Sequence, residues 1–151
     1  MAQTVLVAPL NAVRRAVYAR IQADPVTAAY TLASEGGQAA FPYIAVGPAY
    51  KGRGGVDPAT GVRVNVQVEA YALATNGGAF RAEEMLQDVA VALSSADMTV
   101  TVRTLEGPEV TSEPLQVTIG DDVLTPDLRD SADGEVYAQR FARFEFLITT
   151  P

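Results

Sequence analysis

The sequence predicts an α+β domain of two layers, in which a mostly antiparallel sheet has two helices packed on one side. Two segments repeat apolar residues at steps of three and four, which is the spacing of a helix with one buried face. Two longer segments alternate apolar and polar residues, which is the period of a half-buried strand. Strand-like segments follow one another in clusters, so neighbouring strands are expected to pair antiparallel with the helices segregated from them.

The first helix is expected over residues 9–23. Pro9 suits the first turn of a helix, and Asp24-Pro25 ends it, because a residue before proline avoids the helical region. Arg14 and Arg15 are expected to point away from the apolar face. That face is formed by Leu10, Val13, Val17 and Ile21.

Two short strands are expected next, at residues 29–33 and 41–47. Pro42 lacks an amide donor, so it belongs at the start of its strand or at a sheet edge. Residues 48–61 are rich in glycine and include two prolines, which predicts a long surface loop. This loop would be the tip of a hairpin that joins 41–47 to the next strand.

The clearest strand pattern covers residues 62–73. Its inward face is Val62, Val64, Val66, Val68 and Ala70, and its outward face is Arg63, Asn65, Gln67, Glu69 and Tyr71. Residues 76–78 then break the chain and precede a second helix at 79–94. The inward face of that helix is expected to be Ala79, Ala82, Leu86, Val89, Ala90 and Leu93.

The last third of the chain predicts strands at 98–105, 115–119 and 137–148. Apart from the short strand at 115–119, residues 106–134 read as a second long and acidic loop region. Both faces of 137–148 carry aromatic residues, which indicates a central strand or a strand whose outer face another subunit covers.

Composition argues against an enzyme and against a cofactor or metal site. The chain has no cysteine and no histidine, so it lacks the commonest nucleophiles, general bases and zinc ligands. The one lysine, Lys51, stands in Lys51-Gly-Arg-Gly-Gly, but a phosphate-binding P-loop has its lysine after the glycines and before a helix. We therefore interpret this stretch as part of a hairpin.

Two pairs of adjacent acids could in principle act as acid–base or metal carboxylates. Glu83 and Glu84 are neighbours on a helix, where adjacent residues do not share a face. Asp121 and Asp122 follow a glycine in a turn, without the spacing of a calcium-binding loop. Solvated surface acids explain both pairs. The aromatic residues of 137–148 could stack on bases, but packing in the core or an interface is the simpler reading.

The formal net charge is −7, and it is concentrated in one segment. Residues 106–135 contain nine acids and only Arg129 as a base. This segment is either a set of solvated loops or a functional acidic surface that lines a passage for DNA or binds a basic partner. No signal peptide and no apolar run of about 20 residues is present, so we expect a soluble protein made in a cytoplasm.

Five segments, in their order and spacing, resemble one protein family. They are LNAVRRAVYARIQADP (10–25), FPYIAVG (41–47), VRVNVQVEAYA (62–72), AFRAEEMLQDVAVAL (79–93) and YAQRFARFEFLI (137–148). The sequence resembles the tail-terminator, or tail-completion, proteins of long-tailed bacteriophages, prophages and gene transfer agents. Phe-Pro-Tyr at 41–43 is the most telling of these motifs, and residues 106–130 are longer and more acidic than the family pattern.

The resemblance implies one non-enzymatic structural domain over residues 1–151. Such a protein would form a ring of six copies on the head-proximal end of the tail tube, stop growth of the tube and join it to the head. Its partners would be itself, the tail tube protein and a head–tail connector or stopper protein. DNA would pass through the ring without specific binding. The protein would be located in the virion at the tail–head junction after assembly in the host cytoplasm, without a membrane or cofactor.

Two groups of residues are candidates for the contacts that such a ring needs. We expect contacts with neighbouring subunits or the tube at Lys51, Arg53, Asp57, Phe141 and Arg143. We expect an acidic lumen or connector-facing rim at Asp121, Asp122, Asp127 and Asp130.

Two other functions stay open from the sequence. One is another structural part of the same particle, such as a tail-tube or neck subunit. The other belongs to a different class, a small-ligand-binding α+β domain that uses carboxylates.

Overall fold

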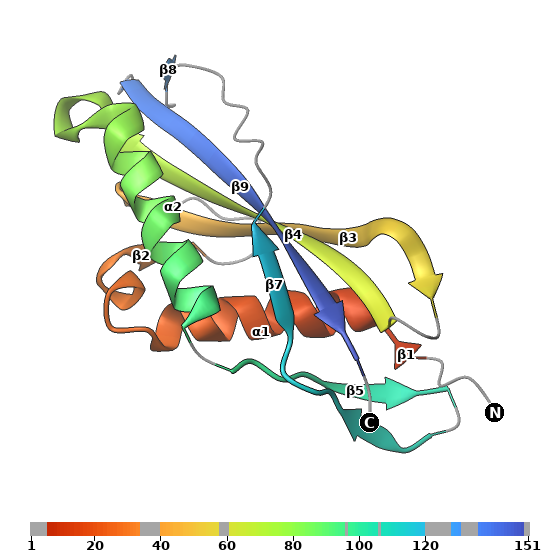
Figure 1. Cartoon of the computed structure of the whole chain (residues 1–151). Coiled ribbons are helices and arrows are strands. Elements are labelled where there is room, and N and C mark those ends of the chain that lie inside the picture. The colour runs from red at the N-terminus through yellow and green to blue at the C-terminus, as the bar shows by residue number, and fades with distance from the viewer. Residues whose placement is uncertain are drawn as a thin grey trace.

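A computed structural model describes residues 6–33, 40–57, 61–95, 97–105, 107–119, 128–130 and 136–149, with backbone alone at 6, 7, 51–57, 76 and 128–130. Figure 1 shows the long strands crossing the molecule beside the two helices, with a small sheet at one end. The elements, in chain order, are β1 (Leu6–Val7), α1 (Pro9–Ala23), the short 3-10 helix η1 (Thr27–Ala29), β2 (Thr31–Leu32), β3 (Tyr43–Asp57), β4 (Gly61–Leu73), η2 (Ala74–Asn76), α2 (Gly78–Ser94), β5 (Thr101–Thr104), β6 (Glu109–Thr111), β7 (Gln116–Ile119), β8 (Leu128–Asp130) and β9 (Val136–Ile148).

The main sheet confirms the predicted α+β class. Its strands lie in the order β2-β3-β4-β9-β7, and β8 also pairs with β9. All of these pairs are antiparallel except β2 with β3. A second sheet, in the order β1-β5-β6, is antiparallel throughout. Both helices contribute buried residues to a core on one face of the main sheet, as the sequence predicted.

The helices occupy nearly the predicted ranges because their apolar periodicity is strong. α1 buries Val13, Val17 and Ile21 and ends where Asp24 turns to an extended conformation before Pro25. On α2 the predicted residues Ala82, Leu86, Val89 and Leu93 are buried, together with Met85 and Ala92. Ala79 and Ala90 were expected to be buried but lie at the margin of the buried stripe, half-buried.

The pairing of β4 with β9 forms the centre of the sheet. Its register runs without interruption from Val62 opposite Ile148 to Leu73 opposite Tyr137. Phe144 and Phe146 of β9 are 0% exposed, so they pack in the core and are not free to stack on bases. Of the two alternatives for 137–148, the structure therefore supports a central strand, with β4 on one side and β7 and β8 on the other.

The prediction of a loop at 48–61 is wrong for most of that range, because β3 continues to Asp57. The glycine and proline residues that led to the loop prediction lie in two irregularities of the pairing with β4. The first, between Val46 and Ala49, contains Gly47-Pro48, and the second, between Lys51 and Val56, contains the glycines of 52–55. The hairpin that joins β3 to β4 is confirmed, and its turn, residues 58–60, lies outside the described residues.

The first of these irregularities is also bonded to α1. Nε and Nη2 of Arg14 donate hydrogen bonds of 2.8 and 2.9 Å to the carbonyl oxygens of Gly47 and Val46. Arg14 was expected to point away from the core side, but its length lets the guanidinium reach the backbone oxygens at this irregularity. The arginine therefore links the helix to the strand.

The loop region expected at 106–134 is also interrupted by more strands than the sequence indicated. β7 matches the predicted strand at 115–119, but β6 and β8 were not predicted. β6 forms because Gly107, at φ +117°, reverses the chain and lets Val110 pair with Val102. Conversely, β5 is shorter than the predicted 98–105, and β2 covers only part of 29–33.

Candidate functional site

The face of the main sheet opposite the helices carries a mixed aromatic and polar surface, which we call the open face. In the described residues no helix packs against it. Strand alternation places there the residues of β4 and β9 whose neighbours point into the core. The open face is formed by Arg63, Gln67, Glu69, Tyr71, Tyr137, Gln139, Phe141, Arg143, Glu145 and Leu147, with Tyr43 of β3 beside them.

Four aromatic rings gather at one end of this face. Tyr43 and Tyr71 lie directly opposite each other on β3 and β4, and their rings stack with centroids 4.4 Å apart. Phe41 lies 5.3 Å from both Tyr43 and Tyr137. Phe41 and Tyr43 are the aromatic residues of the Phe-Pro-Tyr motif, so the most telling segment of the sequence resemblance forms part of this cluster. Aromatic pairs at such distances add about 0.5–1.5 kcal/mol each beyond their burial.

A hydrogen-bond network continues from the cluster along β4. Nε2 of Gln67 donates to Oε1 of Glu69 at 3.0 Å, and the hydroxyl of Tyr71 donates to Oε2 of Glu69 at 2.7 Å. Nε2 of Gln139 on β9 donates to the same hydroxyl at 3.0 Å. Burial, followed by the bond to Glu69, raises the pKa of Tyr71 far above its ordinary value. Burial, followed by Tyr137 and Glu69, also raises the pKa of Tyr43.

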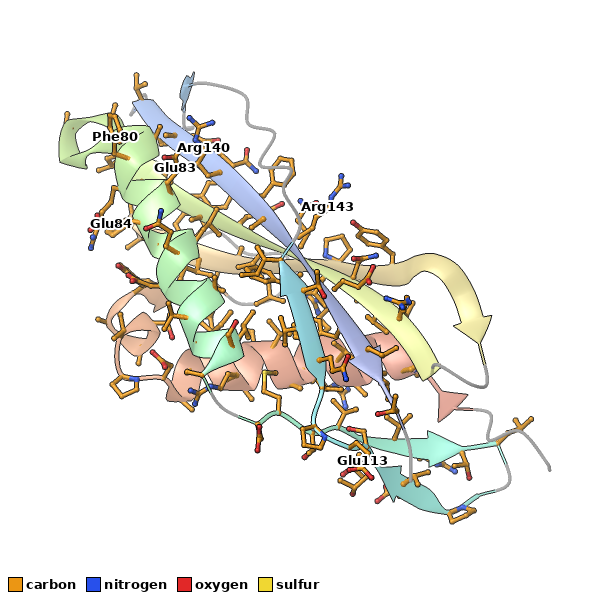
Figure 2. All side chains as sticks on the ribbon, in the orientation of Figure 1. Phe80, Glu83, Glu84, Glu113, Arg140 and Arg143 are labelled. Carbon is orange, nitrogen blue, oxygen red and sulfur yellow. The ribbon has the colours of Figure 1, made fainter. Side chains whose placement is uncertain are left out.

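The middle of the open face is charged. Nη1 of Arg63 lies 2.9 Å from Oε1 of Glu145, and both side chains are partly exposed, so this pair contributes little to stability. Of the predicted contact residues, Phe141 lies opposite Glu69 and is half-buried, while Arg143 lies opposite Gln67 and is exposed. Within the described part of the chain, Arg143 has no ion-pair partner. Figure 2 shows Arg143 projecting from β9 on the side away from α2.

The remaining predicted site residues lie elsewhere. Lys51, Arg53 and Asp57 belong to β3, which β4 separates from the strand of Phe141 and Arg143, and only their backbone is described. Asp130 is in β8, opposite Val136, also as backbone alone. Asp121, Asp122 and Asp127 lie outside the described residues. The expected acidic lumen or rim therefore stays a prediction.

The solvent side of α2 is a second surface with unusual exposure. Phe80 is 84% exposed and Val91 is 64% exposed, with Glu84 and Gln87 exposed between them. Figure 2 shows Phe80, Glu83 and Arg140 close together near the start of α2. Nε of Arg140 lies 3.4 Å from Oε1 of Glu83, which permits charge attraction, but this buried nitrogen makes no hydrogen bond to a described residue.

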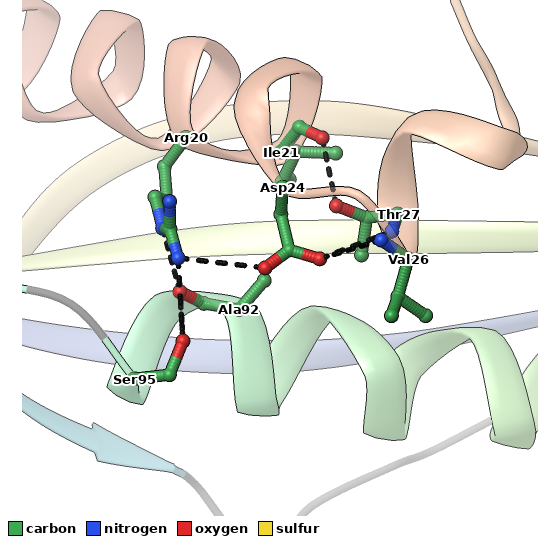
Figure 3. A network of polar contacts seen from close by, with 7 residues as sticks. All are labelled: Arg20, Ile21, Asp24, Val26, Thr27, Ala92 and Ser95. Atoms are coloured by element: carbon green, nitrogen blue, oxygen red, sulfur yellow. Dashed lines mark hydrogen bonds and ion pairs between the residues drawn. The ribbon is translucent and has the colours of Figure 1, made fainter.

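A polar network links the C-terminal ends of α1 and α2 (Figure 3). Nε of Arg20 donates to the carbonyl oxygen of Ala92 at 2.8 Å, and its Nη2 contacts Oγ of Ser95 at 3.2 Å and Oδ2 of Asp24 at 3.4 Å. Oδ1 of Asp24 accepts bonds from the backbone amides of Val26 and Thr27. These contacts satisfy backbone groups where α1 and α2 end, so the network is structural.

The described side chains form no candidate metal site. No three residues of the types His, Cys, Asp and Glu come together there in a group that could hold a metal ion. Glu83 and Glu84 project from an exposed stretch of helix rather than into a shared site. Neither helix in the described chain has the length and apolar character needed to cross a bilayer. The features that stand out are surfaces.

Sequence reasoning missed most of the open-face network. Alternation put Gln67, Glu69 and Tyr71 on one face of 62–73, but nothing local indicated that Gln139 would lie beside Tyr71. It also missed the bond of 2.6 Å from the hydroxyl of Tyr30 to Oδ2 of Asp88. Both contacts depend on how distant segments pack.

The chain matches known proteins in structure but not in sequence. No family model matches the sequence. No curated protein matches it either. Among solved structures, the one described as "Virion of native gene transfer agent (GTA) particle" contains a chain of the same fold, with a TM-score of 0.60 and 18% sequence identity. The likeness covers 96% of this chain and 100% of that chain, so the two share their fold along their whole length.

Proposed function

We propose that this chain is a structural subunit of a tailed, phage-like or gene-transfer-agent-like particle. In this proposal it forms a ring of six copies at the head-proximal end of the tail tube, ends growth of the tube and joins it to the head connector. The observation that carries the proposal is the shared fold with a chain of a gene transfer agent virion over the length of both chains. The sequence resemblance to tail-terminator proteins points to the same class of particle.

The surfaces of the chain agree with a role in assembly. The open face combines half-buried aromatic residues with an exposed arginine, and α2 exposes Phe80 and Val91 on the other side of the molecule. Protein interfaces are enriched in aromatic residues and arginine. A subunit with such surfaces on two sides can contact one neighbour on each side, as a ring requires.

Charge supports the passage of DNA through such a ring. The chain carries −7, and residues 106–135 contain nine acids against Arg129. Asp121, Asp122, Asp127 and Asp130 would line the lumen or the rim that faces the connector. Repulsion from phosphates would prevent DNA from binding there while it moves. Lys51, Arg53 and Asp57 of β3 would contact the tail tube or a neighbouring subunit.

Deletion of the gene in the producing strain tests the proposed function. We expect tail tubes of irregular length and heads without tails in negative-stain electron microscopy, and a plasmid copy should restore normal particles. Normal tails attached to heads would contradict the proposal. Complete loss of tubes would instead indicate a tail-tube subunit, the closest alternative. An intact particle together with small-molecule binding would favour the ligand-binding alternative.

The role of the acidic segment has its own test. Replacing Asp121, Asp122, Asp127 and Asp130 by asparagine should leave particle assembly intact and lower the yield of DNA transfer. Asp97→Asn removes an exposed acid outside this segment and is the control. Normal DNA transfer by the fourfold variant would contradict a role of these acids in the lumen or rim.

A further inference from the structure

Two surface stripes on opposite sides of the molecule, one fully exposed and one half-buried except at Arg143, match each other in spacing and in the order of apolar and polar residues. The first stripe lies on the solvent side of α2 and consists of Phe80, Glu84, Gln87 and Val91. The second lies on β9 in the open face and consists of Phe141, Arg143, Glu145 and Leu147. Each stripe has an apolar residue at both ends and polar residues between them.

The spacing of the two stripes is similar. Phe80 and Glu84 are four residues apart on a helix, which corresponds to about 6 Å along its axis. Phe141 and Arg143 are two residues apart on a strand, which corresponds to about 7 Å. Over their whole lengths, the helix stripe spans about 16 Å and the strand stripe about 20 Å. When α2 of one copy lies along β9 of another, Phe80 can therefore contact Phe141 while Glu84 contacts Arg143.

The two stripes carry opposite charges at one matching position, with Glu84 exposed on α2 and Arg143 exposed on β9. α2 contains Arg81 as its one base and Glu83, Glu84 and Asp88 as its acids, so the helix is net negative. On the open face, Arg63 pairs with Glu145, and Glu69 accepts hydrogen bonds from Gln67 and Tyr71. Arg143 is exposed and has no ion-pair partner among the described residues. Arg81 contacts Glu84 only through an exposed pair at 3.2 Å, which costs little to open.

We infer that α2 of one copy docks on the open face of a second copy, with Phe80 against Phe141 and Glu84 against Arg143. The two surfaces lie on opposite sides of one subunit, so the contact is head-to-tail and leaves each copy free to bind another. This inference deepens the proposed function by naming the surfaces through which copies of the chain would meet, and it rests on the self-association in that proposal.

Contact area determines which experiment can detect this docking. A helix of 17 residues is about 25 Å long and about 10 Å wide, which covers about 250 Å². Stable interfaces bury about 800 Å² on each partner, so this contact is one part of a ring interface and is weak by itself. Covalent trapping is therefore the suitable method, and the absence of cysteine from the chain makes it specific.

The test mixes two single-cysteine variants of the full chain, Glu84→Cys and Arg143→Cys, with a mass tag on one of them. Mild oxidation should join them into a tagged–untagged dimer, because a disulfide forms when the two Cα atoms come within about 7 Å. We expect a yield at least about tenfold above that of either variant alone. The control mixture replaces Arg143→Cys by Arg15→Cys, which puts a thiol at an exposed position of α1.

Equal yields in all mixtures would overturn the inference. A dominant dimer of Glu84→Cys with itself would also overturn it, because that outcome indicates a symmetric contact between helices. Adding Phe80→Ser to Glu84→Cys should reduce the specific yield several-fold, and circular dichroism should show unchanged folding, since Phe80 is 84% exposed. An unchanged yield would contradict the role given to Phe80.

Charge reversal gives an independent readout in the particle. Glu84→Arg and Arg143→Glu should each lower the number of complete particles, and the double variant should recover most of the loss. Absence of recovery contradicts the pairing of these two residues. Specific cross-linking combined with normal particles after gene deletion would remove the proposed function and leave the contact between copies standing.

Discussion

The hydroxyl of Tyr71 donates a 2.7 Å hydrogen bond to Oε2 of Glu69 and accepts a 3.0 Å hydrogen bond from Nε2 of Gln139. One phenol thus joins a carboxylate of its own strand to an amide of the neighbouring strand. Its ring also stacks on Tyr43, so Tyr71 connects three strands of the sheet on the open face.

Tyr71→Phe should lower the free energy of unfolding by about 1–2 kcal/mol, because it removes two hydrogen bonds and keeps the stacked ring. Urea unfolding measures this change, and the slope with urea concentration should stay constant. Tyr50→Phe is the matched control, since Tyr50 lies on β3 and its hydroxyl has no hydrogen-bond partner among the described residues. Equal effects of the two substitutions would mean that the network does not contribute to stability.

The raised pKa of Tyr30 leads us to expect a loss of stability at alkaline pH. Burial, followed by the hydrogen bond to Asp88, raises its pKa from an ordinary value of about 10 to about 12. Because the folded state holds this proton more tightly than the unfolded state does, the neutral tyrosine contributes its full stabilisation below the unfolded-state pKa. This contribution is lost as the pH rises from about 10 towards 12. Urea midpoints should therefore fall over this range by less in Tyr30→Phe than in the wild type. Parallel curves for the two proteins would contradict the raised pKa.

Gly61→Ala should destabilise the chain strongly. Gly61 begins β4 at φ +90°, and an added Cβ would overlap the carbonyl oxygen of Ile148 on β9. Gly107→Ala is a matched control, because Gly107 has φ +117° but no atom within 4 Å of the added Cβ. The control should lose about 1–2 kcal/mol from backbone strain, and Gly61→Ala should lose more because it adds a steric overlap. Similar losses in thermal unfolding would show that β9 moves away readily.

Arg20→Met should lower the free energy of unfolding by about 1–3 kcal/mol. It removes the donor to the carbonyl oxygen of Ala92 and the contacts to Ser95 and Asp24, while an aliphatic stem of similar length remains. Arg15→Met, at an exposed position of the same helix, should change it by less than about 0.5 kcal/mol. Chemical unfolding of the two variants checks the difference, and equal effects would contradict the role of the network.

The strongest periodic segments of the sequence became the elements that they predicted. α1 spans the expected residues and α2 begins one residue earlier than expected, because apolar spacing is strong in both helices and Asp24-Pro25 ends the first. The prediction was wrong at 48–57, where glycine and proline argued for a loop. A neighbouring strand can accept such residues in bulges, and a single segment contains no information about its neighbour.

The candidate site could be predicted only in its parts. Phe141 and Arg143 were expected at a contact surface, and the structure places both on the open face. Lys51, Arg53 and Asp57 were grouped with them as candidate contact residues, but they belong to a different strand, β3. The helix stripe with Phe80 was missed, because a lone phenylalanine in an amphipathic helix gives no sign of its 84% exposure.

The sequence by itself determined which side of each long element faces the core, because helical and strand periods are local properties of the chain. It also excluded cysteine and histidine chemistry through composition alone. Tertiary structure decided which residues meet. Tyr71 reaches Gln139, 68 residues away, and Arg20 reaches Ala92, 72 residues away, only after β4 has paired with β9 and α1 has packed beside α2. Strand register and helix docking set these contacts, and both depend on the combined packing of residues far apart in the chain.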